Sequence, residues 1–363
     1  GSVKIVTQNS IANSNFGTEE TTFDNSNIKE WLNNYFYSKI HDTSYLKEDS
    51  SWCIDSISDI NTTSNNCVSY STSPVGLLSV SDYNLSKDAT GTYLNTITEY
   101  WLINRESNRF GYIHLLLKET GINTNDGTDI SGVKPSLILK NDLYILSGNG
   151  SINNPYRLGD YKEASNNDLL NTRLIGEHVL YFGMSFRISD IDKDGNIRLT
   201  STGYLKNNTT GNYIYSNYEN EDKILKFNPS QEGNIAYQLN HQHLDFIDDS
   251  LIISHEFLLP TYEANKKYSE YLTSKFKTKV SIPASYEMFS ATNEQMTGQA
   301  SYWLLDNVDD NHAFMINSSN GKTFTIDSGS LYNSNGFKIQ FYVSKNTKIK
   351  SGKGTSLNPY VIK

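Results

Sequence analysis

The stretch GVKPSLILKNDLYILSGNGSINNPYRL at residues 132–158 returns at residues 336–362 as GFKIQFYVSKNTKIKSGKGTSLNPYVI. The two segments align without a gap over 27 positions at a constant offset of 204. Identical pairs include Gly132/Gly336, Lys134/Lys338, Ile145/Ile349 and the Asn-Pro-Tyr at 154–156 and 358–360. A match of this length predicts an internal repeat, and such a repeat determines how every other motif is interpreted.

The repeat continues upstream of these segments. Tyr-Trp-Leu at 100–102 matches 302–304, NIKEWLNNYFYSKI (27–40) matches NIAYQLNHQHLDFI (234–247), and VKIVTQNS (3–10) matches NIRLTSTG (196–203). A chain of 363 residues also exceeds the usual size of a single domain. We therefore predict two copies of one domain, at residues 1–160 and 161–363.

The composition indicates a folded chain and excludes several classes of partner. Aromatic residues make up 12% and charged residues 20%, whereas disordered chains are poor in aromatics and rich in charge. The net charge is -9, from 31 basic and 40 acidic residues, with no dense Lys/Arg cluster, so no nucleic-acid partner is predicted. No apolar run has the length of a membrane span and no signal peptide is present, so no membrane insertion is predicted.

The two cysteines, Cys53 and Cys67, lie close together in a polar segment. A disulfide between them would close a loop of about 15 residues and stabilise the fold by roughly 3 kcal/mol. Two free thiols or an incomplete metal site are the alternatives. An even pair flanked by Ser, Thr and Asn favours the disulfide, and with it an oxidising, extracellular location at the cell surface.

Local patterns predict helices and strands at matching places in the two copies. Ile28, Leu32, Phe36 and Ile40 recur every four residues behind capping candidates at 24–26, which predicts a helix over 27–40 and its counterpart over 234–247. Shorter helices are expected at 80–85 and 285–289. Alternating apolar residues predict strands at 136–140, 322–327 and 337–343.

The two copies differ at their starts. The second begins with HVLYFGMSFRISDI (178–191), followed by a turn at 192–196 and by IRLTS, which together predict a β-hairpin. The first begins at the equivalent of the turn and lacks the preceding strand. The opening Gly1-Ser2 is typical of a cloning remnant, so we expect the natural protein to continue upstream; the alternative is that the first domain borrows a strand from elsewhere in the chain.

The ordered set RISDIDKDGNIRL, LLSVSDY, YWL, GVKPSLIL and NPY resembles an uncharacterised domain family of clostridial and other low-GC Gram-positive surface proteins. The resemblance implies an α+β fold of two tandem C-type-lectin-like domains, each with two helices flanking small antiparallel sheets and long loops. It implies no biochemical activity. The Glu-Pro-Asn or Gln-Pro-Asp and Trp-Asn-Asp motifs of calcium-dependent lectins do not occur, so calcium-dependent sugar binding is not implied.

Three patterns have a possible chemical role but favour a structural one. The segment DIDKDG (190–195) resembles the start of an EF-hand, but Ser201 stands where the loop needs a Glu, so a hairpin turn is predicted. His241 and His243 are two residues apart and would point to different faces of a helix, which disfavours zinc. Trp101 and Trp303 are predicted to be core residues, with a sugar-stacking platform as the alternative.

The predicted ligand-binding residues follow the Trp303 strand and all carry side-chain oxygens: Asp306, Asn307, Asp309, Asp310 and Asn311. Hard cations prefer such oxygens, and a solvated loop is the alternative. The first copy carries Arg105 in the matching stretch, which disfavours a metal common to both copies. We predict a polar, loop-borne site with no metal and no cofactor, and calcium is the alternative.

No nucleophile elbow, Cys–His pairing or phosphate-binding glycine loop occurs, so the chain is predicted not to be an enzyme. The prediction is a non-enzymatic extracellular binding or adhesion module of a bacterial surface protein. Its partner would be a host or cell-surface glycan or protein, recognised by loops. The alternative is a structural subunit, such as the soluble part of a type IV pilin-like or wall-anchored stalk protein.

Overall fold

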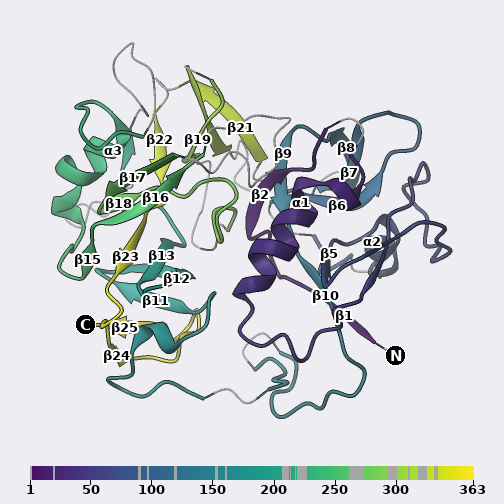
Figure 1. Ribbon diagram of the computed structural model, residues 1–363, viewed down its shortest axis with the longest axis horizontal. Helices are drawn as coiled ribbons and strands as arrows, with labels where there is room; N and C mark the ends of the chain where they lie inside the picture. The colour runs from purple at the N-terminus through teal and green to yellow at the C-terminus, as the bar shows by residue number, and fades with distance from the viewer. Residues whose placement is uncertain are drawn as a thin grey trace.

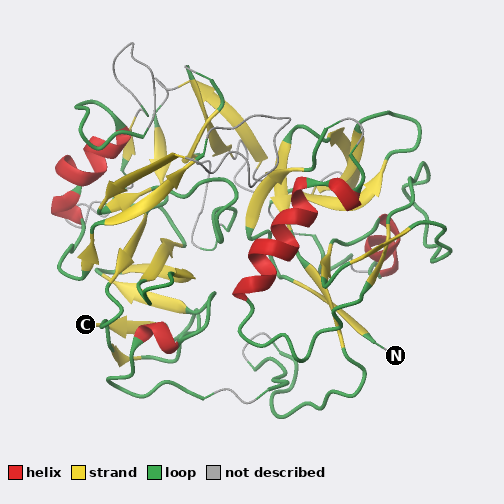
Figure 2. Ribbon diagram, viewed as in Figure 1, coloured by secondary structure: helices red, strands yellow, loops and turns green. Residues whose placement is uncertain are grey.

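Sheet dominates the fold: strands account for 38% of the described residues and helices for 12%, in agreement with the predicted α+β class. Figure 2 shows the few helices beside the more extensive strands. A computed structural model describes residues 2–18, 21–88, 91–95, 98–117, 121–151, 154–159, 162–206, 212, 214–216, 218, 227–260, 274–292, 294, 301–309, 311–317, 325–330 and 334–363. In Figure 1 the first repeat lies on the right and the second on the left. The predicted boundary at residues 160 and 161 falls outside the described residues.

A five-stranded sheet recurs with the same strand order in both repeats. In the first repeat the order is β2 (Ala12–Asn15), β9 (Ile130–Val133), β6 (Tyr100–Arg105), β7 (Tyr112–Leu117) and β8 (Gly121–Asp126). In the second it is β14 (Tyr215–Ser216), β22 (Asn335–Phe337), β19 (Tyr302–Asn307), β20 (His312–Asn317) and β21 (Thr325–Ser330). Each sheet contains one parallel pair at the same place. Strands β6 and β9 place Tyr100 opposite Gly132, and strands β19 and β22 place Tyr302 opposite Gly336. The sequence repeat is therefore also a repeat of topology.

A second sheet repeats in the same way. The strands β1 (Val3–Val6), β10 (Ser136–Leu139) and β5 (Val75–Gly76) correspond to β13 (Ile197–Ser201), β23 (Gln340–Val343) and β18 (Val280–Ser281). The amide of Thr7 donates to Pro135 as that of Ser201 donates to Ile339, at 3.0 and 2.9 Å. Val3 thus matches Ile197, and the predicted match with Asn196 was wrong by one residue. Pairing with the neighbouring strand sets the register, and a short polar alignment does not specify it.

The second repeat extends this sheet with strands that the first repeat does not show in its described part. Next to β13 follow β12 (Met184–Ile191), β11 (His178–Tyr181), β25 (Tyr360–Ile362) and β24 (Ile349–Ser351), and β15 (Ile252–Ile253) pairs with β23. The hairpin predicted around 192–196 is present, but residues 178–191 form two strands where one was expected. Phe182 and Gly183 turn the chain between them with φ of 35° and 80°, as a two-residue hairpin requires. Separate pairs join β3 (Ser51–Cys53) to β4 (Tyr70–Thr72) and β16 (His255–Leu259) to β17 (Ser274–Thr278).

The long predicted helix exists in both repeats. Helix α1 (Asn27–Glu30) is capped by Ser26, whose Oγ accepts from the Lys29 amide at 3.0 Å, and it continues as a π-helical turn to Phe36 and a 3₁₀ turn to Lys39. Its counterpart is α3 (Ile235–Tyr237), which continues to Phe246 in the same manner. The side chains of Asn33 and Asn240 accept from the amides of Val75 and Val280, at 3.0 and 2.9 Å. This equivalence confirms the alignment of 27–40 with 234–247.

The two shorter predicted helices differ in outcome. Helix α2 (Val80–Leu85) forms as expected behind a capping box at Ser79. Residues 285–289 form turns instead, and Phe289 has a φ of 68°, so that prediction was wrong. The segment packs against the first repeat: the Tyr286 carbonyl accepts from the Trp31 indole at 2.9 Å, and the Ser285 carbonyl accepts from the Asn13 amide at 2.8 Å. These contacts with α1 and β2 replace the helical hydrogen bonds.

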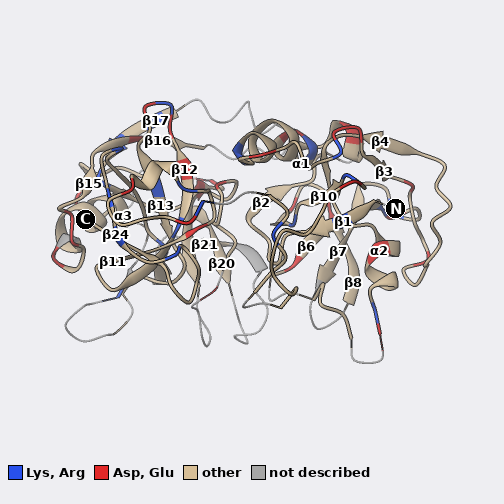
Figure 3. Cartoon of the chain, turned by 90° about the horizontal axis from the view of Figure 1, so that it is seen from below, with Lys and Arg blue, Asp and Glu red and all other residues tan. Residues whose placement is uncertain are grey.

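Positions of Lys, Arg, Asp and Glu are distributed along both repeats (Figure 3). Where the repeats meet, Arg198 and Glu287 form a buried ion pair, and Lys39 of the first repeat pairs with Asp190 of the second. No helix in the described residues is long and apolar enough to cross a membrane. The junction between the repeats is therefore a packed interface with buried charge.

Candidate functional site

Asp306, the first of the predicted ligand residues, lies inside strand β19 and is 1% exposed. Its carboxylate accepts from the Ser285 amide at 2.6 Å and from the Ser285 hydroxyl at 2.8 Å. Burial raises the pKa of Asp306 to about 6, although the hydrogen bonds from Ser285 oppose this shift. Asp306 therefore connects β19 to the 285–289 turn and does not lie on a solvated loop as predicted.

The remaining predicted residues lie at or after the end of β19. Asn307 is half-buried, while Asp309 and Asn311 are exposed; Asp310 lies outside the described residues. Asp309 accepts from the Asn311 amide at 2.7 Å and pairs with the His312 imidazole at 2.9 Å, and these hydrogen bonds lower its pKa. The structure thus divides the cluster into a buried Asp306 and a tight turn before β20.

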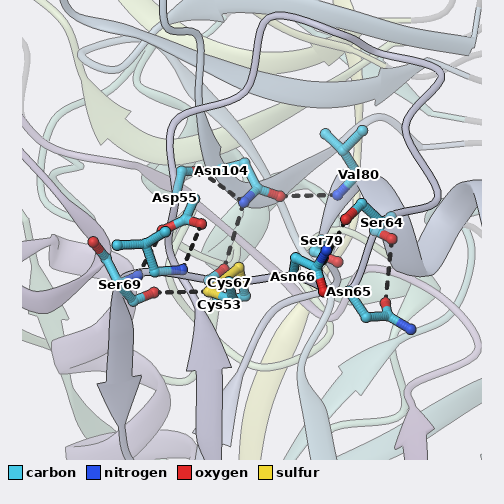
Figure 4. The surroundings of a disulfide bond; sticks show 12 residues. Cys53, Asp55, Ser64, Asn65, Asn66, Cys67, Ser69, Ser79, Val80 and Asn104 are labelled. Carbon is cyan, nitrogen blue, oxygen red and sulfur yellow. Dashed lines mark hydrogen bonds between the residues drawn. A yellow bond between two sulfur atoms is a disulfide. The ribbon is translucent and has the colours of Figure 1, made fainter.

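The first repeat explains the role of Asp306. Asn104 stands at the corresponding place on β6, is fully buried, and accepts from the Val80 amide at 2.9 Å. Its side-chain nitrogen donates to the Asp55 carbonyl at 3.0 Å (Figure 4). In both copies, a polar side chain at this position of β6 or β19 accepts a hydrogen bond from the segment that follows β5 or β18. The sequence signal was available, since Asn104 and Asp306 both follow the Tyr-Trp motif by the same number of residues.

The predicted disulfide is present and joins Cys53 to Cys67 (Figure 4). Asp55 beside it accepts from the amides of Val68 and Ser69, at 2.9 and 2.7 Å. Within the described residues, Cys53, Asp55 and Cys67 are the one group of three metal-binding side chains that lie close together. Because the two sulfur atoms are bonded to each other, this group is a covalent crosslink, and no metal ligation by its thiolates follows.

The structure supports a structural role for the DIDKDG segment (190–195) and for the two tryptophans. Asp192 accepts from the amides of Asp194 and Asn196, both at 2.8 Å, and binds the His255 imidazole at 2.8 Å, so the 192–196 segment is a hairpin turn. Trp101 and Trp303 are fully buried. Neither indole ring is accessible for stacking against a sugar, so the prediction that both are core residues is confirmed.

A cavity of about 570 Å³ lies where α1 and its following loop face the second repeat. Phe36, Ile40, Ile175 and Met288 supply its apolar wall. Its charged and polar lining comes from both repeats: Lys39, His41, Asp42, Tyr45, Lys162, Thr172 and Arg173. The lining residues come from segments more than a hundred positions apart, so local sequence patterns gave no signal for this cavity.

The charged groups around the cavity are already held in place. Arg173 donates to the Tyr360 hydroxyl at 3.0 Å and lies 3.4 Å from the Glu177 carboxylate. Lys39 is paired with Asp190. Hydrogen bonds from Ser44 lower the pKa of Asp42, which keeps this exposed carboxylate ionised. The site thus combines an apolar wall with fixed charges of both signs, an arrangement suited to binding.

No family model, no curated protein and no solved structure matches this chain, so its function has to be argued from this geometry.

Proposed function

We propose that this chain is a non-enzymatic extracellular binding module of a bacterial surface protein, and that its ligand occupies the cavity between the two repeats. The observation that carries the proposal is the cavity itself, with an apolar wall at Phe36, Ile40 and Met288 and a charged lining. Ligand sites in proteins are typically concave, largely apolar and furnished with a few fixed polar groups. The Cys53–Cys67 disulfide supports an oxidising location.

A protein ligand fits this cavity better than a glycan does. An apolar wall of aliphatic and aromatic side chains accommodates an apolar side chain of a peptide, whereas sugar hydroxyls would lose hydrogen bonds to water there. Asp42 and Lys162 can contact charged groups of opposite sign at its exposed side. We therefore expect recognition of a peptide segment that carries one apolar anchor residue.

The test is a binding screen of the full chain against arrays of extracellular matrix proteins and glycans, with and without calcium. For a protein hit, Ile40→Glu should weaken binding at least tenfold, because it places a charge in the apolar wall. Ile60→Glu is the matched control, since Ile60 is exposed and lies outside the cavity lining. If the two variants bind the ligand equally well, the binding site lies outside the cavity. If only glycans bind, the proposal of a protein ligand is wrong.

A structural role in a stalk or pilus-like assembly is the second candidate, and the close packing of the two repeats favours it. The Asn13 amide donates to the Ser285 carbonyl and the Phe289 amide donates to the Ile11 carbonyl, and together with the Lys39–Asp190 ion pair these bonds hold the repeats together. An assembly subunit should self-associate as its concentration rises, which sedimentation velocity measures directly. A chain that remains monomeric at high concentration would exclude self-assembly of this chain alone.

A further inference from the structure

The cavity between the repeats is lined by an unequal set of charged groups. Lys39, Lys162 and Arg173 contribute three cations, whereas Asp42 contributes the one carboxylate among the described lining residues. The chain as a whole has the opposite balance, with 40 acidic and 31 basic residues. The lining of the cavity is therefore richer in positive charge than the molecule around it.

These charged groups differ in their access to solvent. The side chain of Arg173 is 6% exposed and that of Lys39 is 22% exposed, whereas Lys162 is an exposed residue. Asp42 is exposed as well. Two of the three cations are thus largely withdrawn from solvent, while the one carboxylate lies at the solvent side of the cavity.

The carboxylates that balance the two withdrawn cations do not line the cavity. Lys39 pairs with Asp190, and Arg173 lies 3.4 Å from the Glu177 carboxylate. Neither Asp190 nor Glu177 belongs to the described lining. Each ion pair therefore contributes its cation to the cavity wall and also holds that cation in place, which reduces the entropy lost when a ligand binds.

Apolar side chains lie beside the same two cations. Ile40 follows Lys39 at the end of the helical segment that begins with α1, and Ile175 comes two residues after Arg173. A ligand that uses both features must carry its negative charge close to its apolar group. The volume of about 570 Å³ lies within the range of roughly 300–1,000 Å³ that is typical of small-ligand sites, so the cavity accommodates the end of a peptide better than a long segment.

We propose that the ligand of this cavity is the free C-terminus of a polypeptide whose last residue is apolar. The inference rests on the proposed function, because it takes the cavity as the binding site. A C-terminal residue carries its carboxylate and its side chain on the same carbon atom, so the carboxylate can approach Lys39 and Arg173 while the side chain packs against Ile40 and Ile175. An internal acidic residue would bring the following backbone amides against the apolar wall, where they would lose hydrogen bonds to water. Capture of a chain-end carboxylate is one of the recurring modes of peptide recognition.

The probes are peptides of sequence Gly-Ser-Gly-Ser-X, labelled with fluorescein at the N-terminus, in which X is Leu, Ile, Val or Phe. Each is prepared as the free acid and as the C-terminal amide, which removes the negative charge and keeps the apolar side chain. Titration with the full chain, followed by anisotropy, should show saturable binding of a free acid that is about tenfold or more tighter than binding of its amide. The amidated peptide Gly-Ser-X-Asp-Gly-Ser carries an internal carboxylate and should bind no more tightly than the simple amide.

Lys39→Gln tests the role of the cation and should lower the preference for the free acid to about threefold or less. Lys29→Gln is the matched control, because Lys29 lies on the same helical segment, pairs with Asp24 and is also 22% exposed, but does not line this cavity. If loss of the Lys39–Asp190 pair unfolds the junction, Lys162→Gln provides the second test. Lys162 is exposed and forms no ion pair among the described residues, so its replacement should weaken binding of the free acid and leave the fold and the amide unaffected.

Four outcomes would overturn the inference. Equal binding of free acids and amides that Ile40→Glu abolishes would leave the cavity as a peptide site without a preference for a chain end. An internal acid that binds as tightly as the free acid would have the same meaning. Binding of the free acids that neither Ile40→Glu nor Lys39→Gln weakens would place the site outside the cavity and contradict the proposed function as well. Absence of binding by every peptide would overturn this inference alone, because the array screen tests the proposed function separately.

Discussion

Asp306 and Asn104 occupy the same place in the two repeats, and their surroundings determine what each does. An acidic residue among asparagines resembled a ligand loop, yet Asp306 is buried and bound to Ser285. The signal that distinguishes these roles is its alignment with Asn104, which accepts from the Val80 amide in the same manner. An Asp that accepts hydrogen bonds in the core and an Asp that binds a ligand on a loop look alike in the local sequence, so the alignment with Asn104 or the structure itself is needed to distinguish them.

Lys134 and Lys338 are a second matched pair, and both are buried. The Lys338 ammonium donates to the carbonyls of Phe289 and Thr292, at 2.6 and 2.8 Å, and that of Lys134 to the Leu94 carbonyl at 3.2 Å. Burial lowers the pKa of Lys338 to about 7 and that of Lys134 to about 8. Both lysines therefore link folding stability to pH.

We predict that the free energy of unfolding rises with pH between 7 and 8, and that Lys338→Met removes most of this rise. In this range the unfolded chain keeps the lysine proton, because the unperturbed pKa is 10.5, while folded Lys338 releases it. Stability then increases by at most about 1.4 kcal/mol per pH unit. Urea unfolding at both pH values measures it.

Lys134→Met is the control for this experiment. With a pKa of about 8, folded Lys134 is largely protonated at pH 7 and reaches half protonation only at about pH 8, so its loss should leave most of the rise in place. If the free energy of unfolding rises equally with pH in the wild type and in the Lys338→Met variant, Lys338 does not titrate in this range.

Among the elements, the β3–β4 hairpin depends on a covalent link. The two strands pair at Ser51–Cys53 and Tyr70–Thr72, and the disulfide closes the long polar loop between them. Asp55 secures the far side of the loop through the amides of Val68 and Ser69. The loop has few apolar side chains, so the crosslink contributes much of its order.

The double variant Cys53→Ser/Cys67→Ser should lose roughly 3 kcal/mol of unfolding free energy, as expected for a loop of about 15 residues. Chemical denaturation of the variant and of the oxidised wild type measures the difference. A reductant should destabilise the wild type by a similar amount and leave the double variant unchanged. A variant as stable as the oxidised protein would mean that the hairpin is held by its hydrogen bonds alone.

In the whole molecule, the 285–289 segment determines how the repeats associate. Its counterpart in the first repeat is helix α2, but here the chain turns at Phe289 and packs against α1 and β2. Trp31 is buried in this contact and donates to the Tyr286 carbonyl. Since each repeat supplies part of the other's buried surface, we expect the two to unfold together.

Calorimetry should show one unfolding transition for the full chain and two for Trp31→Ala. Removing this side chain should cost about 3–5 kcal/mol, most of it at the contact between the repeats. Trp52 is the matched control, since it is equally buried but lies within the first repeat, where its indole donates to the Ser73 carbonyl at 2.9 Å. Trp52→Ala should lower the temperature of the single unfolding transition without splitting it into two. Two transitions in the wild type would contradict the coupling.

Sequence patterns were sufficient to predict the internal repeat, the long capped helix in each copy, helix α2, the disulfide and the core role of Trp101 and Trp303. These depend on local periodicity, capping and alignment at a nearly constant offset, all of which are properties of neighbouring or matched residues. Long-range packing set the one-residue register of β1, the burial of Asp306 and the turn at 285–289. It also created the cavity between the repeats. Each of these depends on which surface packs against a segment, and residues distant in the chain provide that surface.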